Sequence, residues 1–247
     1  MSKDAIVLLH GFNHDHRCWD LVVEELAKLA PEVPVYAVDL PGRGEKKKQT
    51  ARNPKQGAKS ILKDLEGWGV DRAFLVGHSL AGNTLPMIAI GLGEERTLGQ
   101  MYIAAIVPPE GKSFFTTVIP FRPVSWVIEV GCKLNFPLLL PKPVRNLMWC
   151  NAPATKEHQK MMNDMVVWDP VGIFGSRVTR KGLPRKNLFW LRTLRDHCAT
   201  QGLQSAYRDN LGGVDEELYI DAPHDCMLTN PREVAEIILR KYYQCLN

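Results

Sequence analysis

The chain lacks several features that mark whole classes of protein. No apolar stretch is long enough to span a membrane or to form the core of a secretory signal. No two of its six cysteines have Cys-x-x-Cys spacing, and the formal net charge is only +4 over 247 residues. Its basic runs stand among polar residues, glycine and proline, as in solvated loops. These absences predict a cytoplasmic protein with reduced thiols, no membrane span and no nucleic-acid partner.

Strand-like apolar segments alternate with helical patterns along much of the chain. Four strands are expected early, at Ala5–Leu9, Val33–Leu40, Arg72–Gly77 and Met101–Val107. Helical spacing links them at Arg17–Ala30, Lys59–Trp68 and Leu80–Leu92. Two late strands follow at Asn187–Leu194 and Glu216–Ile220, and a last helix starts at Asn230-Pro231. This rhythm predicts an α/β fold with a doubly wound, mainly parallel, six-stranded sheet.

The rhythm breaks between residues 108 and 184. This segment is rich in proline and large apolar residues but has no clear strand alternation. It is too apolar for a disordered linker. We expect a helical cap inserted between strands four and five, over a core formed by residues 1–107 and 185–247. The cap tryptophans Trp126 and Trp149 are candidates for the wall of a substrate pocket.

The most informative stretch is Val76-Gly77-His78-Ser79-Leu80-Ala81-Gly82, where a strand runs directly into a helix. A nucleophile elbow has the form Gly-x-Ser-x-Gly, because the strained turn leaves no room for larger neighbours. Here alanine stands in the fifth position and glycine comes one residue later. The pattern predicts Ser79 as a nucleophile, and a plain helix N-cap is the alternative for this serine.

A serine nucleophile needs two backbone N–H groups to bind the oxyanion. One is expected from Leu80, the residue after the nucleophile. The other is expected from the loop after the first strand, at Phe12, where Gly11 lets the backbone turn close to a substrate. Phe12 is also a candidate for the pocket wall.

The acid and the base should follow late strands, in the order serine, acid, histidine. Asp196 follows the fifth predicted strand and His224 follows the sixth, so these two complete a triad with Ser79. The structural alternative for Asp196 is a carboxylate that caps a turn and takes no part in catalysis. Rival bases and acids elsewhere in the chain are His78, His158, His197, Glu110, Asp209, Asp215 and Asp221.

A metal site is a weaker interpretation of the histidines near the N-terminus. His10, His14, Asp15 and His16 include a His-Asp-His fragment, but no second cluster with suitable spacing follows. We therefore expect no metal and no cofactor, and a structural hydrogen bond from His10.

With these residues in place, the sequence resembles the α/β-hydrolase superfamily over nearly its whole length. It is most similar to the compact group of plant methylesterases, hydroxynitrile lyases and related bacterial esterases. The resemblance rests on Val7-Leu8-Leu9-His10-Gly11, on the segments 38–44 and 76–82, and on Pro223-His224-Asp225-Cys226-Met227-Leu228. It implies a six-stranded sheet with a cap between strands four and five.

The resemblance also implies a reaction. A serine hydrolase of this kind would cleave the carboxylic ester of a small hydrophobic substrate through an acyl-enzyme, and lactones and thioesters share the machinery. In hydroxynitrile lyases a lysine follows the catalytic histidine, whereas Asp225 stands here and favours ester hydrolysis. A lyase-like enzyme and a receptor with little turnover are the alternatives, and a homodimer is left open.

Overall fold

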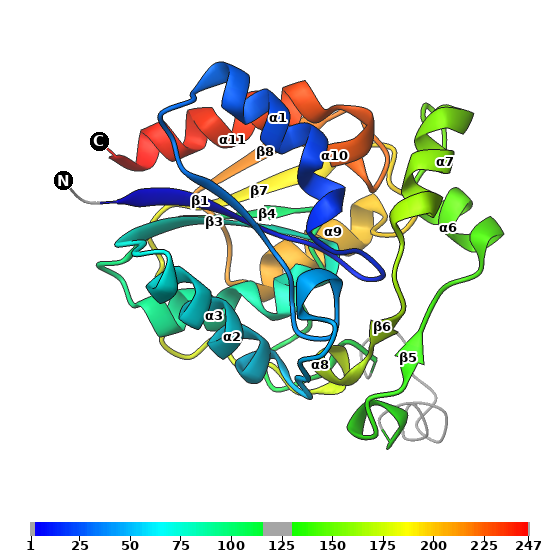
Figure 1. Ribbon diagram of the computed structural model, residues 1–247, viewed down its shortest axis with the longest axis horizontal. Coiled ribbons are helices and arrows are strands. Elements are labelled where there is room, and N and C mark those ends of the chain that lie inside the picture. Colours follow the sequence, from blue (N-terminus) through cyan, green and yellow to red (C-terminus); the bar gives the residue numbers. More distant parts are fainter. Residues whose placement is uncertain (1–2, 116–129, 247) are drawn as a thin grey trace.

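A single parallel sheet runs through the middle of the molecule. The computed structural model describes residues 3–115 and 130–246. Six strands pair in the order β2-β1-β3-β4-β7-β8, every neighbouring pair parallel (Figure 1). Their bounds are β1 Asp4–Leu9, β2 Val35–Val38, β3 Arg72–His78, β4 Thr97–Ile103, β7 Leu188–Thr193 and β8 Glu216–Ile220. The predicted α/β class and six-stranded sheet are confirmed.

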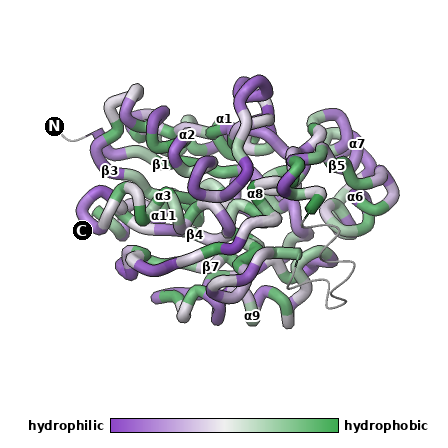
Figure 2. The backbone as a smooth tube through the Cα atoms, turned by 90° about the horizontal axis from the view of Figure 1, so that it is seen from below, coloured by the Kyte–Doolittle hydropathy of each residue, from purple (hydrophilic) through white to green (hydrophobic). Residues whose placement is uncertain are grey.

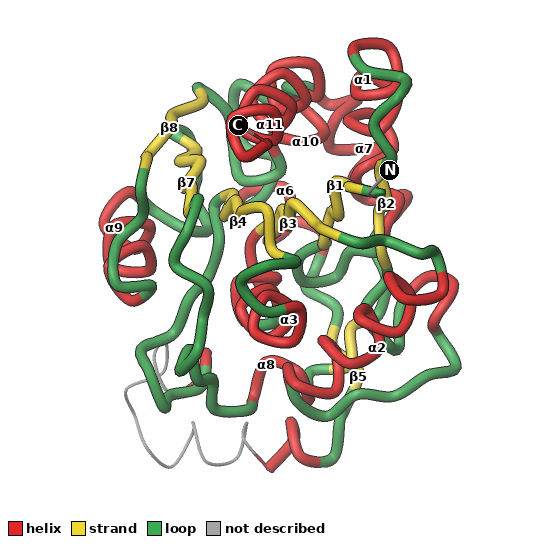
Figure 3. The backbone as a smooth tube through the Cα atoms, turned by 90° about the vertical axis from the view of Figure 1, so that its left-hand side faces the viewer, coloured by secondary structure: helices red, strands yellow, loops and turns green. Residues whose placement is uncertain are grey.

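Helices cover both faces of this sheet. One face packs against α1 (Asp20–Leu29) and α11 (Pro231–Leu246), and the other against α2 (Pro54–Gly67), α3 (Leu85–Leu92) and α9 (Gln201–Asn210) (Figures 1 and 3). Alternate residues of β1 belong to the two cores, Ile6 and Leu8 to one, Val7 and Leu9 to the other. Burial of β1 on both faces explains its unbroken run of apolar residues. Hydrophilic stretches of the chain gather toward the periphery (Figure 2).

Some element bounds differ from the prediction for local reasons. Helix α2 begins at Pro54, earlier than predicted, because the Asn53 side chain accepts a hydrogen bond from the Gln56 N–H and caps it. Strand β4 ends at Ile103 because Ala104, with φ of +43°, turns the chain. Helix α9 was not predicted at all.

The segment between β4 and β7 contains more than helices. It holds α6 (Lys142–Met148), α7 (Lys156–Met165) and α8 (Gly172–Gly175), together with a pair of short antiparallel strands, β5 (Pro137–Leu138) and β6 (Asp169–Pro170). Two-residue strands leave no alternation in a sequence, so the pattern could not reveal them. No helix in residues 3–115 and 130–246 is both long and apolar enough to cross a bilayer.

Buried polar contacts tie this segment to the sheet. The Arg43 guanidinium forms an ion pair with Asp169, and both side chains are fully buried. The same arginine donates to the Pro170 carbonyl at 3.1 Å and lies over the Phe174 ring. The other carboxylate oxygen of Asp169 accepts from the Asn13 N–H at 2.8 Å. One carboxylate therefore holds the loops after β1 and β2 against β6.

We expect Asp169→Ala to destabilise the protein by about 3–5 kcal/mol, because it leaves the buried Arg43 charge without its partner. Urea unfolding measures this free energy. The control is Asp164→Ala, which removes an exposed i,i+4 pair with Lys160 and should change stability little. Equal effects of the two substitutions would contradict a structural role for the buried pair.

Candidate active site

Ser79 sits on a sharp turn between β3 and the 3-10 helix η3 (Ser79–Asn83). Its φ is +52°, a strained value for a residue that is not glycine. A Cβ at Gly82 would lie 2.5 Å from the Ile106 carbonyl oxygen, so only glycine fits there. A Cβ at Gly77 would come within 3.2 Å of the Ala81 Cβ, and glycine at position 77 thus makes room for alanine at 81. The sequence departs from the usual elbow at a position where the packing accepts it.

The three predicted triad residues lie in one hydrogen-bonded chain. His224, which follows β8, has its Nε2 2.8 Å from the Ser79 Oγ. Its Nδ1 lies 2.7 Å from the Oδ2 of Asp196, which follows β7. The exposed fractions of Ser79, His224 and Asp196 are 4%, 1% and 5%. Residues far apart in sequence meet here because parallel strands all end at the same edge of the sheet.

The Asp196 carboxylate is held in place from several sides. Its Oδ2 also accepts from the Thr193 hydroxyl at 2.8 Å. Its Oδ1 accepts from the backbone N–H groups of Cys198 and Ala199, each at 2.7 Å. An ionised carboxylate only accepts hydrogen bonds, so the proton between Asp196 and His224 resides on the Nδ1. In a neutral ring the Nε2 is then an acceptor for the Ser79 hydroxyl.

Opposing effects act on the pKa of His224. Burial favours the neutral ring and lowers the pKa, whereas the charge of Asp196 and the hydrogen bond to it raise the pKa. The net pKa lies well above its ordinary value. The ring therefore takes up a proton readily and has Asp196 beside it to stabilise the cation.

The backbone N–H groups predicted to bind the oxyanion belong to residues close to Ser79. A Cβ at Gly11 would lie only 2.9 Å from the Ser79 Cβ, so the loop after β1 runs directly against the elbow. The next N–H along this loop, that of Phe12, has no hydrogen bond to any described residue. The Leu80 N–H lies in the first turn of η3, where helix N–H groups have no partner within the helix. The segments that carry both predicted oxyanion donors thus adjoin Ser79, and their binding of an oxyanion stays a prediction.

Three further buried histidines lie in or against this loop, and for two of them, His14 and His78, no structural role was predicted from the sequence. His14 lies 3.3 Å from Asp225, and the His78 Nε2 lies 3.0 Å from the His224 carbonyl oxygen. The His10 Nε2 accepts from the Leu40 N–H at 3.1 Å, the structural hydrogen bond expected of this residue. Each of these histidines is one or two residues from a predicted site residue, which was a signal of a role near the site. Nothing in the sequence indicated which partners they would contact.

The remaining candidates from the sequence are the two pocket tryptophans and the rival acids of the triad. Trp149 is buried, its ring centroid 5.3 Å from that of His14, so it packs against the loop after β1. Its contact with substrate stays a prediction, and Trp126 lies outside the described residues. Among the rival acids, Asp221 pairs with Arg195 at the surface. Glu110 accepts from the Arg180 N–H, Asp215 accepts from the Leu188 N–H, and Asp209 pairs with Arg208.

Two groups of potential metal ligands occur among the described residues, and in each of them some ligand atoms already bind other side chains. In the first, His78, His224 and Asp225, both ring nitrogens of His224 belong to the triad. In the second, Asp39 accepts from the backbone and the ring of His16, and Asp15 pairs with Arg17. Neither group offers a vacant set of ligands.

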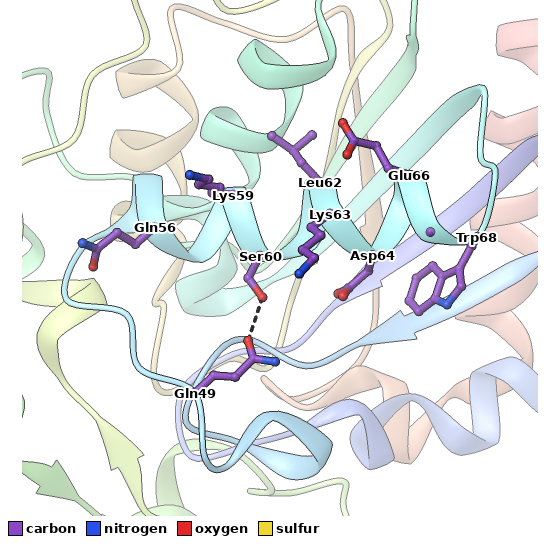
Figure 4. A pocket seen from close by; sticks show the side chains of 10 residues that line it. Gln49, Gln56, Lys59, Ser60, Leu62, Lys63, Asp64, Glu66 and Trp68 are labelled. Atoms are coloured by element: carbon purple, nitrogen blue, oxygen red, sulfur yellow. Dashed lines mark hydrogen bonds between the residues drawn. The ribbon is translucent and has the colours of Figure 1, made fainter.

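A surface hollow of about 970 Å³ lies along α2 (Figure 4). Polar side chains line much of it, including Ser60, whose hydroxyl donates to Gln49 at 3.1 Å. It shares no lining residue with the triad and carries no nucleophile with a base.

A six-stranded parallel sheet with helices on both faces and a serine elbow after β3 defines an α/β hydrolase. The model of the Alpha/beta hydrolase family matches residues 6–237, and the chain belongs to this family.

Curated relatives of different kinds resemble the chain. A probable esterase, PIR7A, from Oryza sativa subsp. indica is 22% identical over 252 residues, which cover 95% of each chain. A dihydrolipoyllysine-residue acetyltransferase component of an acetoin cleaving system from Cupriavidus necator is 29% identical over 111 residues, 44% of this chain. That match covers only 28% of the relative, so the chain corresponds to one part of it.

Solved structures share the fold at low sequence identity. An extracellular alpha/beta-hydrolase from a Paenibacillus species has a TM-score of 0.78 at 18% identity, covering 96% of this chain and 98% of its own. A pyrethroid hydrolase from Sphingobium faniae has a TM-score of 0.72 at 19% identity, with 98% of both chains covered. A methylesterase from Arabidopsis has 0.71 at 16% identity, covering 97% and 99%.

We expect the pKa of His224 to fall in Asp196→Asn. The substitution removes the negative charge that raises this pKa, whereas the burial that lowers it remains. Titration of the histidine ring signals by NMR measures it. Asp221→Asn, which breaks the exposed pair with Arg195, should leave the His224 titration unchanged. A raised pKa that persists without the Asp196 charge would contradict this electrostatic account.

Proposed function

We propose that this protein is a serine hydrolase that cleaves carboxylic esters of small hydrophobic substrates through an acyl-enzyme. The observation that carries the proposal is the unbroken chain of hydrogen bonds from Ser79 through His224 to Asp196. The two N–H groups beside Ser79 supply the second requirement, a site for the oxyanion.

The mechanism follows from these contacts. His224 takes the proton of Ser79 through its Nε2 while the Ser79 Oγ attacks the ester carbonyl. The N–H groups of Phe12 and Leu80 bind the oxygen as it becomes negative. Asp196 fixes the tautomer of His224 and stabilises its cation. His224 then gives the proton to the leaving alcohol, and in the second half it activates the water that releases the acid.

The environment of the triad favours ester hydrolysis over the lyase alternative. Asp225 stands where hydroxynitrile lyases carry lysine, and it is fully buried against His14 rather than presented to a substrate. The Phe12 and Phe174 rings meet edge to face at 5.6 Å beside the oxyanion loop, which suits an apolar substrate. The probable esterase relative and the esterase-like structures support the same class. No cofactor is required, and a cytoplasmic location and a homodimer stay predictions.

Replacing Ser79 by alanine should lower the hydrolysis of p-nitrophenyl esters by about 10³-fold or more, because the attacking oxygen is removed. A panel of esters and lactones assayed with both proteins makes the test. Ser113→Ala, a substitution at another buried serine, is the control and should retain turnover. Retained activity in the Ser79 variant would remove this serine from its role.

The same panel separates the alternatives. Tight, saturable binding of a ligand with negligible turnover by the native chain would favour the receptor. Release of cyanide or aldehyde from a cyanohydrin, without acid release from any ester, would favour the lyase.

The pH dependence should follow the charge of His224. Only the neutral ring can accept the Ser79 proton, so kcat/KM falls as the pH drops through the pKa of His224. Since this pKa is raised, the acid limb should lie above its ordinary value of about 6.5. In Asp196→Asn we expect kcat to fall by about 10⁴-fold and the acid limb of the residual activity to move to lower pH. If the acid limb of the pH profile stays at the same pH in this variant, a group other than His224 controls it.

A further inference from the structure

A second pair of buried ionisable side chains lies behind the oxyanion loop. His14 and Asp225 are 1% and 0% exposed, and the His14 Nε2 lies 3.3 Å from the Asp225 Oδ2. Neither oxygen of this carboxylate accepts a hydrogen bond from a described group. A buried carboxylate without hydrogen bonds needs a cation beside it. The charge of Asp225 therefore depends on its neighbouring histidines.

His14 is the histidine placed to carry the positive charge beside Asp225. Its Nδ1 lies 2.8 Å from the Phe12 carbonyl oxygen, and its Nε2 lies at ion-pair distance from the Asp225 carboxylate. The hydrogen bond to Phe12 needs a proton on the Nδ1, so a neutral ring would turn its Nε2 lone pair toward the carboxylate. The doubly protonated ring carries an N–H at both nitrogens and avoids this repulsion. Burial lowers the pKa of His14, but Asp225 raises it further, to a net increase. The other histidine near this carboxylate, His78 at 3.9 Å, has its pKa lowered to about 3 by burial and stays neutral.

The backbone around the Phe12 N–H is held on both sides by histidines. The His10 Nδ1 lies 2.9 Å from the Gly11 carbonyl oxygen, which belongs to the same peptide unit as the Phe12 N–H. The next peptide unit, which carries the Phe12 carbonyl, is held by His14. Asp225 in turn follows His224 directly in the chain. One ion pair thus connects the loop that binds the oxyanion to the backbone that carries the base.

We propose that His14 is a positioning residue, which aims the Phe12 N–H at the oxyanion by holding the Phe12 carbonyl, with Asp225 as its counter-ion. The proposal rests on the proposed function, because it assigns that N–H to the oxyanion of an ester reaction. His14 itself touches no reacting atom.

The test compares two variants at position 14 that keep a hydrogen-bond donor at different places, one near the Nε2 position of the ring and the other near the Nδ1 position. His14→Gln places an amide near the Nε2 position, within reach of Asp225 but without a donor at the Nδ1 position. The double variant with His14→Asn and Asp225→Asn keeps an amide donor at the Nδ1 position and buries no charge. His158→Ala is the control, since His158 caps α7 by a hydrogen bond with Thr155.

We expect His14→Gln to lower kcat for p-nitrophenyl butyrate by about 10²-fold with little change in KM, because a misaimed donor weakens only the transition state. The affinity for butylboronic acid, whose adduct with serine is tetrahedral, should fall in parallel. The affinity for butanoate, a ground-state ligand, should not change. The double variant should recover most of the lost kcat and boronate affinity, and His158→Ala should match the native protein.

Several results would overturn the proposal. One is a kcat and a boronate affinity of His14→Gln within about twofold of the native values. Another is an equal loss of boronate and butanoate affinity, which would indicate general disorder of the site. If His14→Gln does not fold, Asp225→Asn, which leaves a neutral ring at position 14, should show a smaller selective loss of boronate affinity. Unchanged affinity there also overturns the proposal. Activity that survives Ser79→Ala would instead overturn the proposed function itself.

Discussion

The contact between the Asp196 carboxylate and the His224 ring is the interaction on which the site depends. A buried negative charge is costly unless donors surround it, and here a hydroxyl, two backbone N–H groups and the imidazole do so. These donors fix the carboxylate, the carboxylate fixes the proton on the Nδ1, and the Nε2 is left facing Ser79. In the proposed mechanism, the reactivity of the serine follows from how one acid after β7 is held.

Buried histidines in this region differ in charge because their partners differ. His10 accepts a backbone N–H at one nitrogen, which a protonated ring could not do, and burial lowers its pKa to about 4. For His78 burial also dominates, whereas His14 and His224 each have a carboxylate that raises the pKa. Local partners, rather than burial alone, decide which rings carry a proton.

Strain and close packing at the elbow are the other condition for the site. The positive φ of Ser79 persists because glycines at positions 11, 77 and 82 let the neighbouring backbone approach. The buried pair of Arg43 and Asp169 holds the loop after β2 against β6, and the same carboxylate accepts from Asn13 in the oxyanion loop. The segment between β4 and β7 therefore stabilises the loop that carries Phe12.

The sequence by itself determined the α/β class and the parallel sheet, and it selected the three residues of the candidate triad. It could do so because strands buried on both faces leave unbroken apolar runs, and because the elbow needs small residues at fixed spacing. Helix α9 and the short strands β5 and β6 left too weak a pattern. The ion pair of His14 with Asp225 and that of Arg43 with Asp169 could not be inferred from the sequence. Only the tertiary structure decided these pairings and the charge of each histidine, because the partners are far apart in the chain and meet only after the sheet has formed.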